Sequence, residues 1–184
     1  MSAVCEFAHF SGQCVNLTMF DVLKAFEHID HAHLAREAKR FSFDLCLLRW
    51  LLNLYRITRH IVVNKVCTTG VRAYRTIVPG DSFADLLMFL ALIGATDKIS
   101  ARYPDAYIGM VCDDLQVLSV GTGDFVTEQA EDIAIDFYES LEHVCRLPVS
   151  IKKLVFITKS CRVRRHLIRR VPFLQKAFKK GPEI

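Results

Sequence analysis

The chain has 184 residues, of which 52% are hydrophobic and 24% are charged. This is enough for one domain with a core, too short for two, and unlike a disordered chain. The net charge of +4 hides an asymmetry: from Ser150 onward there are 11 Lys or Arg and one acid, whereas the preceding residues hold 13 bases and 19 acids. A basic tail on an acidic body favours a polyanionic partner, although a merely solvated tail has the same composition.

The cysteines and the apolar runs exclude several classes of protein. Seven cysteines are scattered without a CxxC pair, which argues against a disulfide framework or a zinc site. We therefore expect reduced thiols in an intracellular protein, with nucleus and cytoplasm not distinguished. No signal peptide is recognisable, and the most apolar stretch, 83–95, is interrupted by Asp85 and too short to span a bilayer.

The first half of the chain predicts one strand followed by mostly helical structure. A strand over 14–20 ends at Asp21, and a helical stretch over 32–55 is broken near Ser42. A β-branched run then indicates a strand within 59–65. Pro79-Gly80 precedes a helix over 82–100 whose apolar residues run nearly all round, as in a buried helix, and which Asp81 or Ser82 would cap.

The second half predicts a hairpin. Two apolar runs, 107–111 and 115–120, flank Cys112-Asp113-Asp114, which places the acids at the turn. An amphipathic helix over 126–145, a strand over 154–158 and a basic helix over 162–180 follow. This mixture predicts an α+β fold, in which an antiparallel sheet with a β-hairpin carries helices on one face.

Three acids are the candidate chemical residues. Asp21 ends an apolar strand and Asp113-Asp114 tips an apolar hairpin, where carboxylates are costly unless they are solvated, paired or metal-bound. If the three converge, their hard oxygens would select magnesium or manganese, and two such ions can promote in-line phosphoryl transfer. An Asp-Asp pair in a turn is also common for conformational reasons alone, so its surroundings decide.

Four segments resemble, in order, the motifs of reverse transcriptases of the non-LTR retroelement and group II intron type. Residues 21–31, with Asp21, Ala25-Phe26, Ile29 and His31, resemble motif A. Residues 76–84 resemble motif B, a Gly before a long helix. Residues 111–114 resemble the Asp-Asp hairpin of motif C, and residues 147–153 resemble motif D, a Leu, a small polar residue and a Lys. The resemblance spans about 14–160 and implies a polymerase palm with a catalytic β-hairpin.

The resemblance implies roles for the acids and for motif D. Asp21 and Asp113 would be the principal ligands of two Mg²⁺ ions, with Mn²⁺ as an alternative metal. Asp114 would be a supporting acid, and the backbone carbonyl of Val22 would add a ligand. Lys153 would assist the pyrophosphate leaving group, with Lys152 as its rival and a solvated strand end as the alternative.

Two residues would contact the nucleotide. Phe26 would lie under the incoming sugar, where a bulky ring excludes a 2′-hydroxyl and favours deoxynucleotides; a core aromatic is the alternative. Gly80 would let the backbone approach the template base and the nucleotide.

The implied activity is RNA-directed DNA synthesis, the transfer of deoxynucleotide triphosphates to the 3′ end of a DNA primer on an RNA template. Residues 1–160 would form the palm, with the fingers largely missing, and residues 161–184 a basic tail or thumb remnant. Five arginines of this tail are candidate nucleic-acid contacts: Arg162, Arg164, Arg165, Arg169 and Arg170. Because little of the fingers and thumb accompanies the palm, the same motifs are also expected in a truncated or inactive fragment of such an enzyme.

Some positions depart from the family pattern, and some alternatives stay open. Pro79 replaces a common Gln, Asp81 a small or apolar residue, and Val111 an aromatic residue, which would alter template or nucleotide contacts but not the metal ligands. The histidines at 28, 31 and 33 do not share a helical face at ligand spacing, so polar contacts at the helix start are expected rather than zinc binding. The alternatives are another palm enzyme, such as an RNA-dependent RNA polymerase or a nucleotide cyclase, and a non-catalytic retroelement remnant with a nucleic-acid-binding surface.

Overall fold

The computed structural model describes residues 10–111, 114–150, 153–158, 165 and 169. The chain divides into two compact units, one made of residues 1–23 and 95–184 and the other of residues 24–94. Helix α5 (Ala84–Arg102) contributes to both, because the boundary falls within it.

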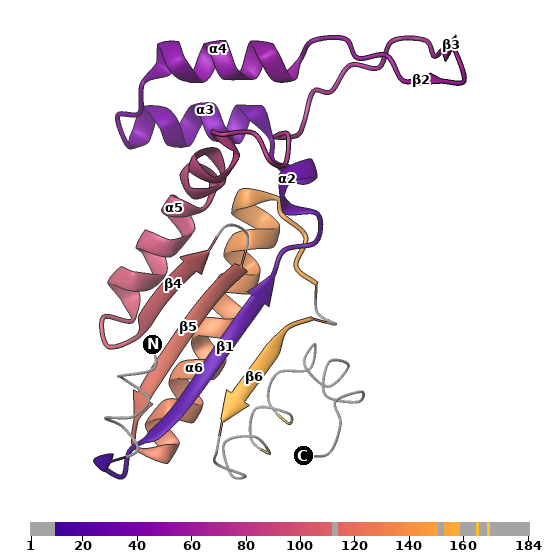
Figure 1. Ribbon diagram of the computed structural model, residues 1–184. Coiled ribbons are helices and arrows are strands. Elements are labelled where there is room, and N and C mark those ends of the chain that lie inside the picture. The colour runs from indigo at the N-terminus through magenta and orange to yellow at the C-terminus, as the bar shows by residue number, and fades with distance from the viewer. Residues whose placement is uncertain (1–9, 112–113, 151–152, 159–164, 166–168, 170–184) are drawn as a thin grey trace. The chain divides into compact units, whose positions relative to one another are not determined.

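The first unit is built on a four-stranded antiparallel sheet in the order β4-β5-β1-β6 (Figure 1). Strand β1 (Cys14–Asp21) is internal and pairs with β5 (Asp114–Gly121) and with β6 (Val155–Thr158). Strands β4 (Tyr107–Val111) and β5 form the predicted hairpin. Asp114 was expected in the turn, but it is the first residue of β5, because it pairs with both Val111 and Asp21.

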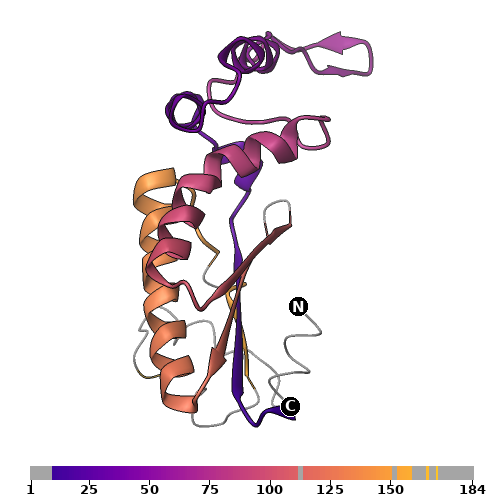
Figure 2. The ribbon, with the colours of Figure 1, turned by 90° about the vertical axis from the view of Figure 1, so that its left-hand side faces the viewer.

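Helix α6 (Gly123–Glu139) packs on one face of this sheet and continues as a π-helical segment, η1 (Ser140–Cys145) (Figure 2). The predicted amphipathic helix is therefore confirmed. Its buried apolar residues recur at helical spacing, at Val126, Ala130, Ile133, Ala134 and Phe137. The ring of Phe137 lies 5.4 Å from that of Phe20 on β1, centroid to centroid.

Side-chain alternation sorts the residues of the two central strands between the faces of the sheet. Asn16, Thr18 and Phe20 of β1 are at most 1% exposed, and their register partners on β5 are Ser119, Val117 and Leu115. Phe20 contacts α6, so this buried set faces the helix. Because successive strand residues point to opposite faces, Asp21 and Asp114 belong to the opposite face.

The second unit begins with three helices, α2 (Ala25–His28), α3 (His31–Arg40) and α4 (Leu45–Tyr55). The break expected near Ser42 is confirmed, since Ser42 has a left-handed φ of 55°. Aspartates begin the two longer helices: Asp30 accepts a hydrogen bond from the Ala32 amide, and Asp44 accepts from the amides of Cys46 and Leu47.

A two-stranded ribbon follows α4 and extends away from it (Figure 1). It contains β2 (Val62–Val63) and β3 (Val66–Cys67), so the strand predicted within 59–65 is shorter than expected. The two turn residues, Asn64 and Lys65, have φ values of 50° and 65°, as tight hairpin turns require. We call residues 56–75, which include this ribbon, the arm.

Helix α5 confirms the predicted helix over 82–100, and Asp81 rather than Ser82 begins it: the Phe83 amide donates to Asp81 Oδ1 at 2.7 Å. The prediction that this helix is buried on all sides was wrong, because Leu86 and Phe89 are 43% and 37% exposed. Within the described part of the chain, no helix is both long and apolar enough to cross a membrane. Among the described residues, Cys14, Cys46 and Cys67 are free thiols.

Candidate active site

Asp21 and Asp114 are register partners at the end of the β1–β5 ladder. Directly opposed residues of antiparallel strands project from the same face at close range, so the two acids are neighbours. The buried pairs that follow them, Phe20 with Leu115 and Thr18 with Val117, fix this register through the core. Asp113 lies outside the described residues.

Lys153 completes this constellation from the other side of β1. Its Nζ donates a hydrogen bond to Asp21 Oδ1 at 2.9 Å, and the two side chains are 64% and 23% exposed respectively. A tight turn places the lysine here, because the amides of Lys153 and Leu154 both donate to the Ser150 carbonyl. Lys152, its predicted rival, lies outside the described residues.

The backbone around Asp21 is held by residues 148–150. The Ser150 amide donates to the Asp21 carbonyl and the Leu23 amide donates to the Pro148 carbonyl, both at 2.8 Å. Val22, which lies between them, is 2% exposed, and its backbone pairs with that of Val149 in an isolated antiparallel β-bridge. The backbone at Asp21 therefore lies between two neighbours, residues 148–150 on one side and β5 on the other.

The carboxylates fit a hard cation in two respects. Asp21 Oδ2 is buried and accepts no hydrogen bond, so it has unsatisfied acceptor capacity. Asp114 is exposed and lies opposite, which brings two like charges together. Among the described residues there is no group of three or more His, Cys, Asp or Glu side chains arranged to hold a metal ion. A complete ligand set would thus require Asp113 or a backbone oxygen such as that of Val22.

Phe26 and Gly80 both belong to the second unit. Phe26 is half-buried on α2 and so is not a fully buried core aromatic, and its carbonyl accepts from the Ile77 amide at 2.7 Å. Gly80 has a φ of +82°, and a Cβ there would meet nothing within 4 Å. The left-handed backbone accounts for a glycine here, and no described residue lies close enough to require one.

Of the three residues that depart from the motif pattern, Pro79, Asp81 and Val111, Asp81 lies beside Tyr55. Burial, together with the neighbouring Asp81 carboxylate, raises the pKa of the Tyr55 hydroxyl to about 12. Asp81 itself accepts the hydrogen bond that begins α5. Pro79 and Val111 are exposed.

His31 and His33 make structural contacts in the second unit. His31 Nε2 donates to the Thr76 carbonyl and His33 Nε2 to the Ala91 carbonyl, each at 2.8 Å, and both side chains are nearly fully buried. Arg56 donates to His31 Nδ1, which fixes a neutral ring. These bonds agree with the expectation that the histidines make polar contacts near the start of the helix.

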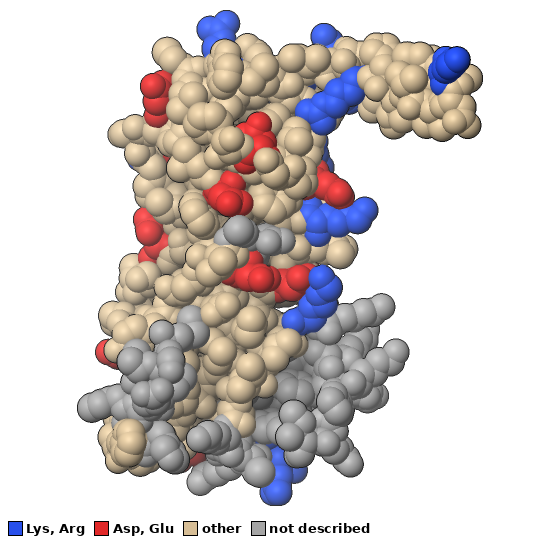
Figure 3. Space-filling view, viewed as in Figure 1, with Lys and Arg blue, Asp and Glu red and all other residues tan. Residues whose placement is uncertain are grey.

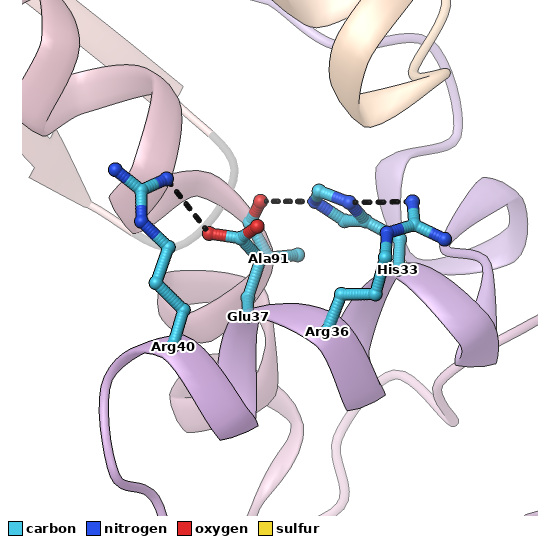
Figure 4. A network of polar contacts seen from close by, with 5 residues as sticks. All are labelled: His33, Arg36, Glu37, Arg40 and Ala91. Atoms are coloured by element: carbon cyan, nitrogen blue, oxygen red, sulfur yellow. Dashed lines mark hydrogen bonds and ion pairs between the residues drawn. The ribbon is translucent and has the colours of Figure 1, made fainter.

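Figure 4 shows the network in which His33 takes part. Arg36 contacts His33 Nδ1 at 3.4 Å, and Arg40 pairs with Glu37 at 3.7 Å on the same helix. Gly94 lies against this network, because a Cβ added there would overlap Glu37 Oε2. The absence of a Cβ at Gly94 thus leaves room for the ends of the Glu37 and Arg40 side chains.

The five tail arginines are only partly described. Arg165 and Arg169 are exposed and helical, while Arg162, Arg164 and Arg170 lie outside the described residues. The division into 1–160 and 161–184 therefore stays a prediction. Sequence interpretation missed the arm as a basic surface, although the absence of any acid between Asp44 and Asp81 was a readable signal.

The sequence matches no family model and no curated protein. Solved structures do match. A telomerase from Candida tropicalis in complex with a TWJ fragment of telomeric RNA aligns with a TM-score of 0.63 at 11% identity, over 87% of this chain and 29% of the telomerase. An apo telomerase from the same organism, truncated from its C-terminal domain, aligns with a TM-score of 0.50 at 11% identity, over 80% of this chain and 31% of the other.

These likenesses show the fold alone. The α+β prediction is confirmed: the chain has an antiparallel sheet with helices and a fold similar to that of telomerase, a reverse transcriptase. The chain spans less than a third of the length of either telomerase.

Proposed function

We propose that this chain is the palm of a reverse-transcriptase-like nucleotidyltransferase, with Asp21, Asp113 and Asp114 as the acids of its catalytic centre. The observation that carries the proposal is the register pair Asp21–Asp114, on the sheet face opposite α6. This pair occurs in a telomerase-like fold, and the sequence around it resembles motifs A and C. The finer assignment to the non-LTR or group II type rests on the sequence motifs, since both structures compared are telomerases.

Divalent cations, Mg²⁺ or Mn²⁺, would supply charge neutralisation for the attacking and leaving oxygens of a phosphoryl transfer. Asp21 would use its buried Oδ2, Asp114 its exposed carboxylate, and Val22 its carbonyl oxygen. The backbone bonds from Ser150 and to Pro148 hold Asp21 in place, so little reorganisation would be needed at the reacting centre.

Lys153 would act as a positive charge beside the nucleotide phosphates. Its ammonium already lies at the acids, 2.9 Å from Asp21 Oδ1, on a largely exposed side chain that can reorient. Phe26 would exclude ribonucleotides and Gly80 would keep the backbone open beside the template. Under this proposal the substrates are deoxynucleotide triphosphates, a DNA primer and an RNA template, and one of the telomerase structures was solved with RNA.

One observation favours a non-catalytic alternative. Asp21 is already neutralised internally by Lys153, so the acids and the lysine could serve as a structural ion pair in a remnant that only binds nucleic acid. Metal binding distinguishes the two functions.

The test is a Mn²⁺ titration followed by thermal unfolding and by electron paramagnetic resonance. A ligand that binds only the folded state raises its stability with concentration. We expect Mn²⁺ to stabilise the wild-type chain and to lose this effect in Asp21→Asn and Asp113→Asn. The matched control is Asp105→Asn, an exposed acid of the same unit with the same charge change. Equal Mn²⁺ responses in all four proteins would exclude the proposal.

Primer extension with Mn²⁺ then tests the chemistry itself. Deoxynucleotides should be incorporated in preference to ribonucleotides, and Phe26→Val should relax this preference. Retained metal binding without extension would limit the proposal to a metal-binding palm.

A further inference from the structure

We propose that the arm is a nucleic-acid-binding element, which contacts the sugar–phosphate backbone of a strand through its five exposed basic residues. The choice of a nucleic acid over other polyanions rests on the proposed function. The surface itself is defined by charge, exposure and an ordered backbone.

The charge of the arm is entirely of one sign. Residues 45–80 contain six Lys or Arg and no Asp or Glu, in a chain that is otherwise acidic before Ser150. Five of these bases lie within the arm, and all five are exposed: Arg56, Arg59, Lys65, Arg72 and Arg75. In Figure 3 the arm shows Lys and Arg side chains and no acid on the visible face. A surface with charge of one sign suits a polymer with one negative charge per residue.

Backbone pairing holds the arm in one conformation. Arg59 and Val71 exchange two hydrogen bonds, of 2.9 and 2.8 Å, and the Thr68 amide donates to the Ile61 carbonyl. Pairing shifts by one residue between Arg59–Val71 and Val62–Cys67, which indicates a bulge near Gly70. A Cβ at Gly70 would overlap Thr58, so the glycine permits the two segments to approach.

The base of the arm is tied to the second unit. The Thr76 amide donates to the Ile29 carbonyl, and the backbones of Arg75 and Asp30 pair in an isolated antiparallel β-bridge. On the other segment, Arg56 Nε donates to His31. A charged ribbon that is ordered at both ends loses less entropy on binding than a flexible tail does.

The apolar side chains of the arm favour a strand over a membrane. Ile61, Val62 and Val63 are consecutive and 59–65% exposed, and neighbouring residues of a ribbon point to opposite faces. Membrane-surface elements instead collect their apolar side chains on one face. Tyr74, 67% exposed between Arg72 and Arg75, offers a ring on which an unpaired base can stack.

The experiment measures fluorescence anisotropy of labelled single-stranded DNA, single-stranded RNA and an RNA–DNA duplex over a range of salt concentrations. The test variant is Lys65→Gln/Arg72→Gln/Arg75→Gln. Its matched control is Lys39→Gln/Arg49→Gln/Lys98→Gln, which removes three exposed charges outside the arm. We expect the test variant to lose affinity on the order of tenfold, and its salt slope to fall by about 2 for single strands, whereas the control changes little.

Two further variants separate geometry and stacking from charge. Gly70→Val leaves the net charge unchanged but forces the segments apart, and should weaken binding to the same oligonucleotides. Tyr74→Ala should weaken single-strand binding by about fivefold or more while changing duplex binding less. Thermal unfolding of the triple variant and of Tyr74→Ala should remain near that of the wild type, because the altered side chains are exposed.

Three outcomes would overturn the inference: equal affinities for the test and control triples, an unchanged affinity in Gly70→Val, or loss of binding to vesicles of phosphatidylserine and phosphatidylcholine without loss of binding to oligonucleotides. The proposed function is tested separately, by the Mn²⁺ response. The arm variant should keep that response, and Asp21→Asn should keep oligonucleotide affinity, so either proposal can fail alone.

Discussion

Lys153 Nζ lies 2.9 Å from Asp21 Oδ1, across a sequence separation of 132 residues. The same carboxylate keeps its second oxygen, Oδ2, buried and without a hydrogen bond. The lysine thus neutralises one half of the carboxylate and leaves the other half unsatisfied. A cation arriving at Asp21 would compete with the ammonium for this charge.

Lys153→Gln should therefore raise the affinity of the chain for Mn²⁺, by up to about fivefold. The limit follows from the pair's exposure, since surface ion pairs contribute about 0.2–1 kcal/mol. Electron paramagnetic resonance of free Mn²⁺ measures the change. Lys24→Gln is the control, because Lys24 pairs with Glu27 in the second unit. Unchanged or weaker binding in Lys153→Gln alone would show that the lysine does not compete at the site.

Strand alternation was sufficient to predict β1 and the β4–β5 hairpin from sequence, because the apolar runs there are local. It could not place Asp114 opposite Asp21, since that depends on the register between strands far apart in the chain. For the same reason the sequence suggested Lys153 as a phosphate contact and did not reveal its ion pair with Asp21. Asp113 remains a prediction, since it lies outside the described residues.

The second unit shows a different limit of sequence interpretation. Asp30 and Asp44 begin helices by local rules, and the break at Ser42 follows from the pattern. The role of Gly94 depends on how closely α3 approaches α5, which no local pattern reports. The arm was overlooked because the basic charge was assigned to the C-terminal tail.

Gly94→Ala should destabilise the chain by no more than about 1 kcal/mol, because its new methyl group would overlap only the end of the flexible Glu37 side chain, which can change its rotamer. Urea unfolding measures the loss. Glu37→Ala in the same chain should recover part of it by making room, so the double-mutant cycle should be non-additive. Gly123→Ala is the control, because its Cβ would lie 3.6 Å from Cys14 Sγ, an ordinary contact. Additive losses would show that the overlap does not determine the cost.

His31 should make stability depend on pH. Burial lowers the pKa of His31 from its usual 6.5 and Arg56 lowers it further, while the bond to the Thr76 carbonyl and Asp30 act in the opposite direction. The folded state therefore binds a proton less readily than the unfolded state. Stability is complete above about pH 6.5 and is lost as the pH falls from there towards the lowered pKa, by at most about 1.4 kcal/mol per pH unit.

His31→Gln removes this titration and can still donate to the Thr76 carbonyl. Urea unfolding at pH 7.5 and pH 5.5 should give a smaller difference in free energy for this variant than for the wild type. His143→Gln, at an exposed position, should leave the difference unchanged. An equal pH dependence in wild type and His31→Gln would assign the effect to other groups.

Tyr103 and Arg102 both bind Asp136 on α6, so they connect the end of α5 to the helix that covers the sheet. The Tyr103 hydroxyl donates to Asp136 Oδ2 at 2.8 Å, and Arg102 lies 2.7 Å from the same oxygen. Burial, with the bond to Asp136, raises the pKa of Tyr103, so the hydroxyl remains a donor at neutral pH. Tyr103→Phe should lower the free energy of unfolding by about 1–2 kcal/mol, because a hydrogen bond to a charged group is lost.

Tyr107→Phe is the control for this substitution, since it removes a hydroxyl from a tyrosine that is 56% exposed on β4 and should cost less than about 0.5 kcal/mol. Combining Tyr103→Phe with Arg102→Gln should cost more than the sum of the single losses, because the partly buried Asp136 carboxylate would then lose both partners. A loss no greater than that of the control would mean that Arg102 alone satisfies Asp136.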